Sequence, residues 1–177
     1  MKIIDIEIHE VHIPAQEFNR EALQLYMGDR FNTQTIVILH TDNGLEGLAE
    51  FSTPLTSQLC SDLEQLRGTN PANWLADDTL NIWLAPAIYD LVGKALEVPA
   101  YQLFGTKKRD HVPVAYWTFS QTPSMMAAEV QRAAELGYTW MKYHTDHFHN
   151  IIDQTRAMQE VAPNGFKVHF DVNFDNS

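Results

Sequence analysis

The chain has 177 residues, a hydrophobic fraction of 45% and a formal net charge of −11 at pH 7. These values indicate a globular chain with a real core, and the acidic balance argues against a nucleic-acid or anionic-membrane surface, because both need a basic patch. No apolar run approaches the roughly 20 residues of a membrane span, and the N-terminus alternates instead of forming a signal-peptide core, so we expect a cytoplasmic protein with no membrane partner.

The N-terminal part predicts a three-stranded antiparallel sheet. Apolar and polar residues alternate over residues 2–9, and a change of phase then predicts a β-bulge near His9 and Glu10. Residues 14–32 have no clean period and are predicted to form a long loop. A β-branched run, the Asp42-Asn43-Gly44 turn signal and a second extended run over 45–51 predict a hairpin.

Two helices are predicted to follow the hairpin. Leucines recur at helical spacing over residues 57–67, and a second apolar stripe covers residues 85–96, with Pro86 in the first turn. The basic run at 106–109 is interpreted as a solvated linker between two units.

Strands and helices alternate beyond the linker. Strands are predicted at 112–117, 139–144 and 166–173, with helices from Thr122 to about residue 136 and from about 150 to 161 between them. Alternation of this kind implies parallel strands joined by right-handed crossovers. Trp117 is interpreted as a core residue.

Polar side chains gather on one face of the last two predicted strands. Since side chains alternate along a strand, Lys142 and His144 share a face of one strand, and Asp171 and Asn173 share a face of the next. The opposite faces are apolar. Polar groups at the carboxyl ends of neighbouring parallel strands are typical of a barrel active site.

Four segments together resemble the mandelate racemase and muconate lactonizing enzyme branch of the enolase superfamily. They are residues 41–50 with the strands around them, the helix at 87–96, the segment 98–105, and the pair Lys142-Tyr-His144 and Asp171-Val-Asn173. The resemblance implies an α+β capping domain, with a three-stranded antiparallel sheet plus helices, over residues 1–108. Residues 109–177 would then be a partial (β/α) barrel containing its first three βα-type strands.

The resemblance also implies a chemistry. Such enzymes are racemases or dehydratases that bind Mg²⁺ through carboxylates on successive barrel strands and remove the proton α to the carboxylate of a hydroxy or sugar acid. Lys142 falls on the first position of a Lys-x-Lys motif, and His144 stands where the second lysine, usually the base, would be. Asp171 falls on the first metal ligand, and Asn173 matches a supporting asparagine. Residues 109–177 are far fewer than the roughly 200 that a barrel needs, so we expect an incomplete site that is inactive alone.

Two other interpretations remain open. The first is a non-catalytic fold remnant whose open third barrel strand is covered by self-association, which makes a homo-oligomer the expected state. The second is a small metal-binding protein that uses the cluster His144, Asp146, His147 and His149, since imidazoles and a carboxylate lie close together in sequence.

Overall fold

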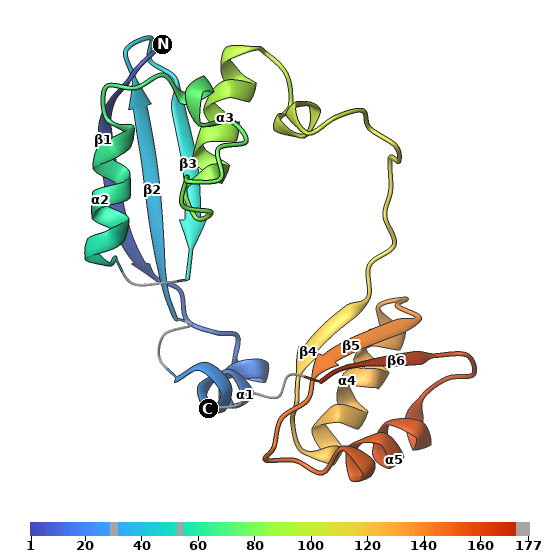
Figure 1. Cartoon of the computed structure of the whole chain (residues 1–177). Coiled ribbons are helices and arrows are strands. Elements are labelled where there is room, and N and C mark those ends of the chain that lie inside the picture. The colour runs from blue at the N-terminus through green and yellow to red at the C-terminus, as the bar shows by residue number, and fades with distance from the viewer. Residues whose placement is uncertain (29–31, 53–54, 173–177) are drawn as a thin grey trace. The chain divides into compact units, whose positions relative to one another are not determined.

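The structure is a computed structural model that describes residues 1–28, 32–52 and 55–172, and its elements are shown in Figure 1. The chain divides into two compact units, residues 1–14 with 27–110, and residues 15–26 with 111–177. Among the described residues, no helix is both long enough and apolar enough to span a membrane.

The first unit is built on a three-stranded antiparallel sheet in the order β1-β2-β3. Its strands are β1 (Ile3–His12), β2 (Thr33–Thr41) and β3 (Glu46–Phe51). The predicted hairpin is confirmed, because β2 and β3 pair in register across the Asp42-Asn43-Gly44 turn. The predicted position of the bulge is wrong, since the register shifts between Ile3 and Asp5.

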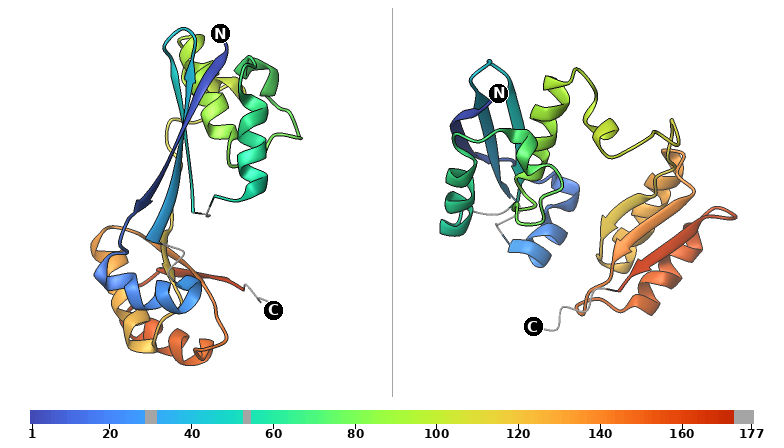
Figure 2. Two further views of the ribbon diagram at one scale, coloured as in Figure 1. Left: turned by 90° about the vertical axis from the view of Figure 1, so that its left-hand side faces the viewer. Right: turned by 45° about the horizontal axis from the view of Figure 1, so that its top comes forward.

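Two helices cover one face of this sheet, as the two views in Figure 2 show. They are α2 (Ser57–Leu66) and α3 (Ala85–Ala95), and short 3-10 helices span Pro71–Trp74 and Ala100–Leu103. Leucine side chains of α2 and α3 join strand residues such as Val37 and Leu39 in a single buried core. Helix α3 lies against β3 so closely that a Cβ atom at Gly47 would stand 2.3 Å from the carbonyl oxygen of Ala87.

The second unit is a parallel sheet covered on one face by two helices. The sheet has the order β4-β5-β6 and consists of β4 (Tyr116–Phe119), β5 (Trp140–His144) and β6 (Lys167–Asp171). Helices α4 (Pro123–Glu135) and α5 (Ile151–Val161) provide the crossovers between these strands (Figure 1). Parallel strands with helical crossovers were predicted and are confirmed, although the first of them begins at Tyr116, four residues later than expected.

The core of the second unit lies between the sheet and these helices. Met141 and Tyr143 of β5 are fully buried against Met126 and Val130 of α4 and Met158 of α5. The side chains of Thr122 and Asn150 cap the two helices by accepting hydrogen bonds from the first-turn N–H groups. This packing leaves the opposite face of the sheet uncovered by α4 and α5.

Hydrogen bonds to the buried carboxylate of Glu129 connect β4 to α4. The Tyr116 hydroxyl donates to Glu129 Oε2 at 2.6 Å, and Thr118 Oγ1 and Gln121 Nε2 donate to Glu129 Oε1 at 2.9 and 3.0 Å. Burial, followed by the bond to Glu129, raises the pKa of Tyr116 to about 12. The Tyr116 hydroxyl therefore keeps its proton at neutral pH and donates a hydrogen bond to this carboxylate.

Helix α1 (Glu17–Met27) occupies most of the segment predicted to be a loop. The prediction was wrong because the polar residues of this segment obscure a helical pattern, while Glu17 provides an acidic first turn that favours a helix.

Candidate functional site

The strand register places two rows of side chains on the face of the parallel sheet that α4 and α5 leave uncovered. Trp117 pairs with Lys142, which pairs in turn with His169. In the second row Phe119 pairs with His144, which pairs with Asp171. The alternation that buries Met141 and Tyr143 on the helix side turns all six of these residues to the other side.

The polar residues of this face converge on one carboxylate oxygen. Lys142 Nζ lies 2.6 Å from Asp171 Oδ2, and His144 Nε2 lies 3.2 Å from the same oxygen. The side chains of Lys142 and His144 are each 25% exposed and that of Asp171 is 36% exposed, so the cluster is half-buried and reaches solvent. The structure therefore brings together three of the four residues that the sequence singled out.

The neighbouring groups favour the ionised form of Asp171. The hydrogen bond from Lys142 is the main cause of a pKa of Asp171 below its ordinary value, and the charges of Lys142, His144 and His169 lower it further. An ionised carboxylate only accepts hydrogen bonds, so its contact with His144 favours the tautomer with the hydrogen on Nε2. In the neutral imidazole the basic lone pair is then on Nδ1.

Asn173 lies outside the described residues, so the position expected for it is not tested. The candidate roles of Lys142, His144 and Asp171 likewise remain predictions, although their geometry is now known.

Two aromatic side chains on this face were missed by the sequence interpretation. Trp117 was predicted to be a core residue, but it is 44% exposed and its ring centroid lies 5.7 Å from that of His144. Phe119 is buried, and its ring centroid lies 4.4 Å from that of Trp117. The signal was the alternation Tyr116-Trp117-Thr118-Phe119, which was hidden because the strand was predicted to end at Trp117.

The histidine cluster of the loop after β5 does not gather into a metal site. Asp146 accepts hydrogen bonds from the N–H groups of Phe148 and His149 and lies 2.9 Å from His149 Nδ1. Burial raises the pKa of Asp146, but the bonds from His149 outweigh it and leave that pKa below the ordinary value. Within residues 1–28, 32–52 and 55–172, no three His, Cys, Asp or Glu side chains are placed to hold a metal ion.

Comparisons with known proteins place this geometry in context. No family model matches the sequence. A 72-residue stretch, 41% of the chain, is 36% identical to D-galactonate dehydratase from Pectobacterium atrosepticum, of which it covers 19%. A dipeptide epimerase from Enterococcus faecalis, solved with Mg and the dipeptide L-Leu-L-Tyr, matches 98% of the chain with a TM-score of 0.72 and 22% identity.

A member of the enolase superfamily from Roseovarius nubinhibens matches 97% of the chain with a TM-score of 0.67 and 20% identity. The chain has the enolase-superfamily fold. Its α+β unit is the capping domain of that fold, and its parallel sheet with α4 and α5 is part of the barrel. The predicted resemblance is thus confirmed for the fold, whereas the boundary between residues 108 and 109 stays a prediction.

The chain covers only part of these relatives, namely 54% of the dipeptide epimerase, 50% of the Roseovarius protein and 19% of the dehydratase. Within the described residues, the enolase-type face of the sheet carries one carboxylate, Asp171, whose Oδ2 atom is already engaged by Lys142 and His144. Mg²⁺ takes near-octahedral oxygen coordination, so this donor set by itself does not fit the ion.

Proposed function

We propose that Lys142, His144 and Asp171 belong to a site that removes the proton α to the carboxylate of a hydroxy or sugar acid, as in a racemase or a dehydratase. Such a proton is very weakly acidic. Its removal needs a positioned base and a group that stabilises the negative charge of the enediolate. The face of the parallel sheet provides candidates for both roles.

The observation that carries this proposal is the convergence of Lys142 Nζ and His144 Nε2 on Asp171 Oδ2, at 2.6 and 3.2 Å. These groups lie at the carboxyl ends of neighbouring parallel strands in an enolase-type fold, where the chemistry of barrel enzymes is concentrated.

Each residue has a distinct proposed role. His144 is the base, and its Nδ1 atom receives the proton because Asp171 holds the hydrogen on Nε2. Lys142, as an ammonium group, places positive charge beside the carboxylate that becomes an enediolate. Asp171 orients both side chains, and it is also the residue that the resemblance assigns as a metal ligand.

Mg²⁺ is the cofactor expected for the complete site, where it would stabilise the enediolate charge. Because the described residues supply one carboxylate, we infer that further ligands must come from outside them and that this chain alone does not catalyse the reaction. The cytoplasmic location and the lack of nucleic-acid partners that the sequence indicates also remain predictions.

A chimera tests the proposed roles. Residues 1–172 would replace the corresponding part of the D-galactonate dehydratase from Pectobacterium atrosepticum, and exchange of the α-proton of D-galactonate would be followed by NMR in D₂O. We expect exchange that falls at least about 100-fold in His144→Ala. His147→Ala, which alters an exposed imidazole of the next loop, is the matched control and should leave the rate unchanged. Equal rates for the two variants would refute the role of His144.

Self-association is the second candidate function, and one observation favours it. Within the described residues, β4 and β6 each pair with β5 alone, so each has one strand edge without a partner. Exposed edges of this kind promote pairing between chains. Light scattering of the purified chain should then give a homo-oligomer, and a monomer at all concentrations would exclude this candidate.

A further inference from the structure

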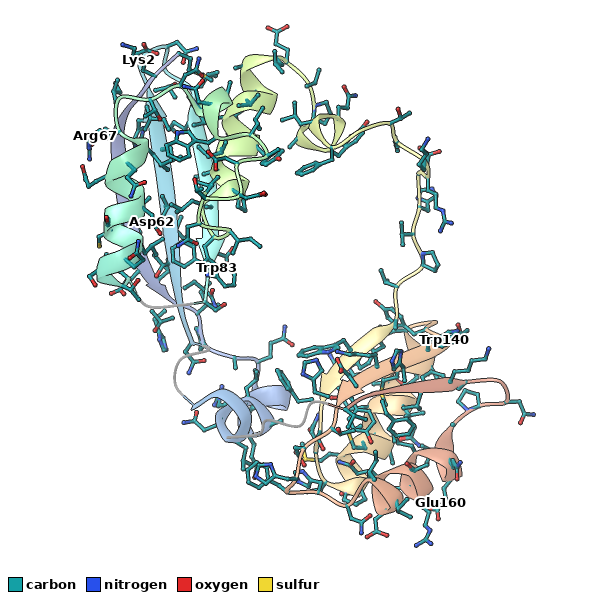
Figure 3. All side chains as sticks on the ribbon, viewed as in Figure 1. Lys2, Asp62, Arg67, Trp83, Trp140 and Glu160 are labelled. Atoms are coloured by element: carbon teal, nitrogen blue, oxygen red, sulfur yellow. The ribbon has the colours of Figure 1, made fainter. Side chains whose placement is uncertain are left out.

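The chain contains two Asn-Gly sequences, and both lie in exposed turns. Asn43-Gly44 lies between β2 and β3, and Asn164-Gly165 lies between α5 and β6. The second turn follows the last turn of α5, which carries Glu160 (Figure 3). An asparagine before glycine is chemically labile, because glycine has no side chain to hinder attack by its own amide nitrogen. The sequence makes the two sites equivalent, and the structure separates them.

Hydrogen bonds restrain both reacting groups of Asn43-Gly44. The Gly44 N–H donates to the Thr41 carbonyl oxygen at 3.0 Å, and the Thr41 hydroxyl donates to Asn43 Oδ1 at 2.6 Å. The main chain also closes around the pair, since the Thr41 N–H donates to the Leu45 carbonyl oxygen at 3.0 Å. The side-chain amide of Asn43 and the nitrogen that would attack it are therefore both held in place.

Asn164-Gly165 lacks these restraints within the part of the chain that the structure describes. Its turn is closed outside the pair, where the Phe166 N–H donates to the Pro163 carbonyl oxygen at 3.0 Å. Neither the Gly165 N–H nor the Asn164 amide forms a hydrogen bond with another described residue. Space does not separate the two sites, because a Cβ atom at either glycine would have no neighbour within 4 Å. Hydrogen bonding is therefore the difference between them.

We propose that Asn164 is a site of spontaneous deamidation, with water as the co-reactant. The Gly165 nitrogen loses its proton to a base and attacks Asn164 Cγ. A new N–C bond forms, the Cγ–Nδ2 bond breaks, and ammonia leaves with that proton. Water then opens the resulting succinimide ring at either carbonyl carbon, which leaves aspartate or isoaspartate at position 164. The reaction consumes water and releases ammonia, and no electron is transferred.

The reaction changes the main chain just before β6. This strand starts at Lys167, whose N–H donates to the Thr139 carbonyl oxygen at 3.0 Å, and the preceding Phe166 packs against the core of the second unit. Isoaspartate adds a carbon atom to the main chain of the turn, and either product adds a negative charge. The modified turn therefore enters β6 with an altered backbone.

Ageing of the purified full chain in mildly alkaline buffer made with ¹⁸O water tests this inference. Proteolysis and mass spectrometry then give the rate at which heavy oxygen enters the fragments that contain Asn164 and Asn43. We expect Asn164 to react about tenfold faster, the factor that one ordinary hydrogen bond can account for. In the chain unfolded in urea the two rates should become similar, because the restraints on Asn43 are lost and glycine follows both asparagines.

Variants assign the reaction to its residues. Ion exchange of the aged chain should separate a main acidic species that is absent in Asn164→Gln, because glutamine would have to close a larger ring. The same species should persist in Asn43→Gln. Thr41→Val, which removes the hydroxyl group bonded to Asn43 Oδ1, should raise the rate at Asn43.

Equal rates at Asn43 and Asn164 in the folded chain, or a faster reaction at Asn43, would overturn the inference. So would an aged folded chain in which Asn164 gains no heavy oxygen. Deamidation at Asn164 is independent of the roles proposed for Lys142, His144 and Asp171, so these outcomes leave the proposed function as it stands.

Discussion

Asp171 Oδ2 lies 2.6 Å from Lys142 Nζ and 3.2 Å from His144 Nε2, and this shared contact bears on which imidazole nitrogen can act as a base. We predict that neutral His144 has its proton on Nε2. ¹⁵N NMR should give a pyrrole-type shift for Nε2 and a pyridine-type shift for Nδ1. Asp171→Ala should mix the two tautomers. A wild-type spectrum with the proton on Nδ1 would contradict the role given to His144.

Lys142 should control the titration of Asp171. The folded pKa of Asp171 is lowered, chiefly by the bond from Lys142, so its ionised form stabilises the fold. This contribution is complete above the ordinary Asp pKa of about 3.9 and is lost as the pH falls through the lower folded value.

Lys142→Met should therefore raise the pKa of Asp171 toward its ordinary value, as measured by ¹³C NMR of the carboxyl group. Lys167→Met is the control, because Lys167 lies at the opposite end of β6 from Asp171. It pairs there with Trp140, and its Nζ atom lies 4.7 Å from the centroid of the Trp140 ring. An unchanged titration of Asp171 in Lys142→Met would mean that the ion pair does not form in solution.

At the scale of elements, the close contact of β3 with α3 depends on the lack of a side chain at Gly47. A Cβ atom at Gly47 would lie 2.3 Å from the Ala87 carbonyl oxygen and 2.5 Å from Leu91 Cγ. We predict that Gly47→Ala lowers the free energy of unfolding by about 1–3 kcal/mol in urea titrations. Leu48→Ala, at an exposed position of the same strand, should change it by less than about 0.5 kcal/mol. Similar values for both variants would refute the close packing.

The junction of β4 with α4 depends on Glu129 as an acceptor of three hydrogen bonds, from Tyr116, Thr118 and Gln121. Glu129→Gln would place an amide donor against these donors, and we predict a loss of about 1–3 kcal/mol in unfolding free energy. Glu135→Gln, on the exposed side of the same helix, is the matched control. If both variants have the same unfolding free energy, the hydrogen bonds to Glu129 do not contribute to stability.

The elements differ in how well the sequence predicts them. Strands and helices with a strong apolar period, such as β5, α3 and α5, follow from pattern alone because their buried faces repeat regularly. Helix α1 does not, since charged and amide residues are interspersed among its apolar residues and obscure the period. Strand β4 was placed too early, because Val112 and Val114 suggest a strand although both are exposed.

The candidate site was predictable as far as strand alternation extends. Side-chain alternation places Lys142 and His144 on one face of β5, and Asp171 lies on the neighbouring strand. The parallel register then brings the three residues together. The position of Trp117 could not be foreseen in the same way, because it depends on where β4 begins and on its pairing with Lys142. Side-chain convergence on a single oxygen atom of Asp171 is likewise a property of the folded sheet.

At the scale of the whole molecule, the chain combines a capping domain with part of a barrel, and it covers about half of the solved structures that share its fold. We therefore predict that the face carrying Lys142, His144 and Asp171 needs further metal ligands to be active. The capping unit and the barrel unit each have their own buried core, so this face can be intact in a chain that does not catalyse.

The most direct test is the rate of α-proton exchange when the purified chain is incubated with MgCl₂ and 2-hydroxy acids, including D-galactonate, in D₂O. We predict no exchange above the rate without protein, because the described residues supply one carboxylate for the metal. Mg²⁺-dependent incorporation of deuterium that disappears in Asp171→Asn would contradict it, since the site would then be complete within this chain.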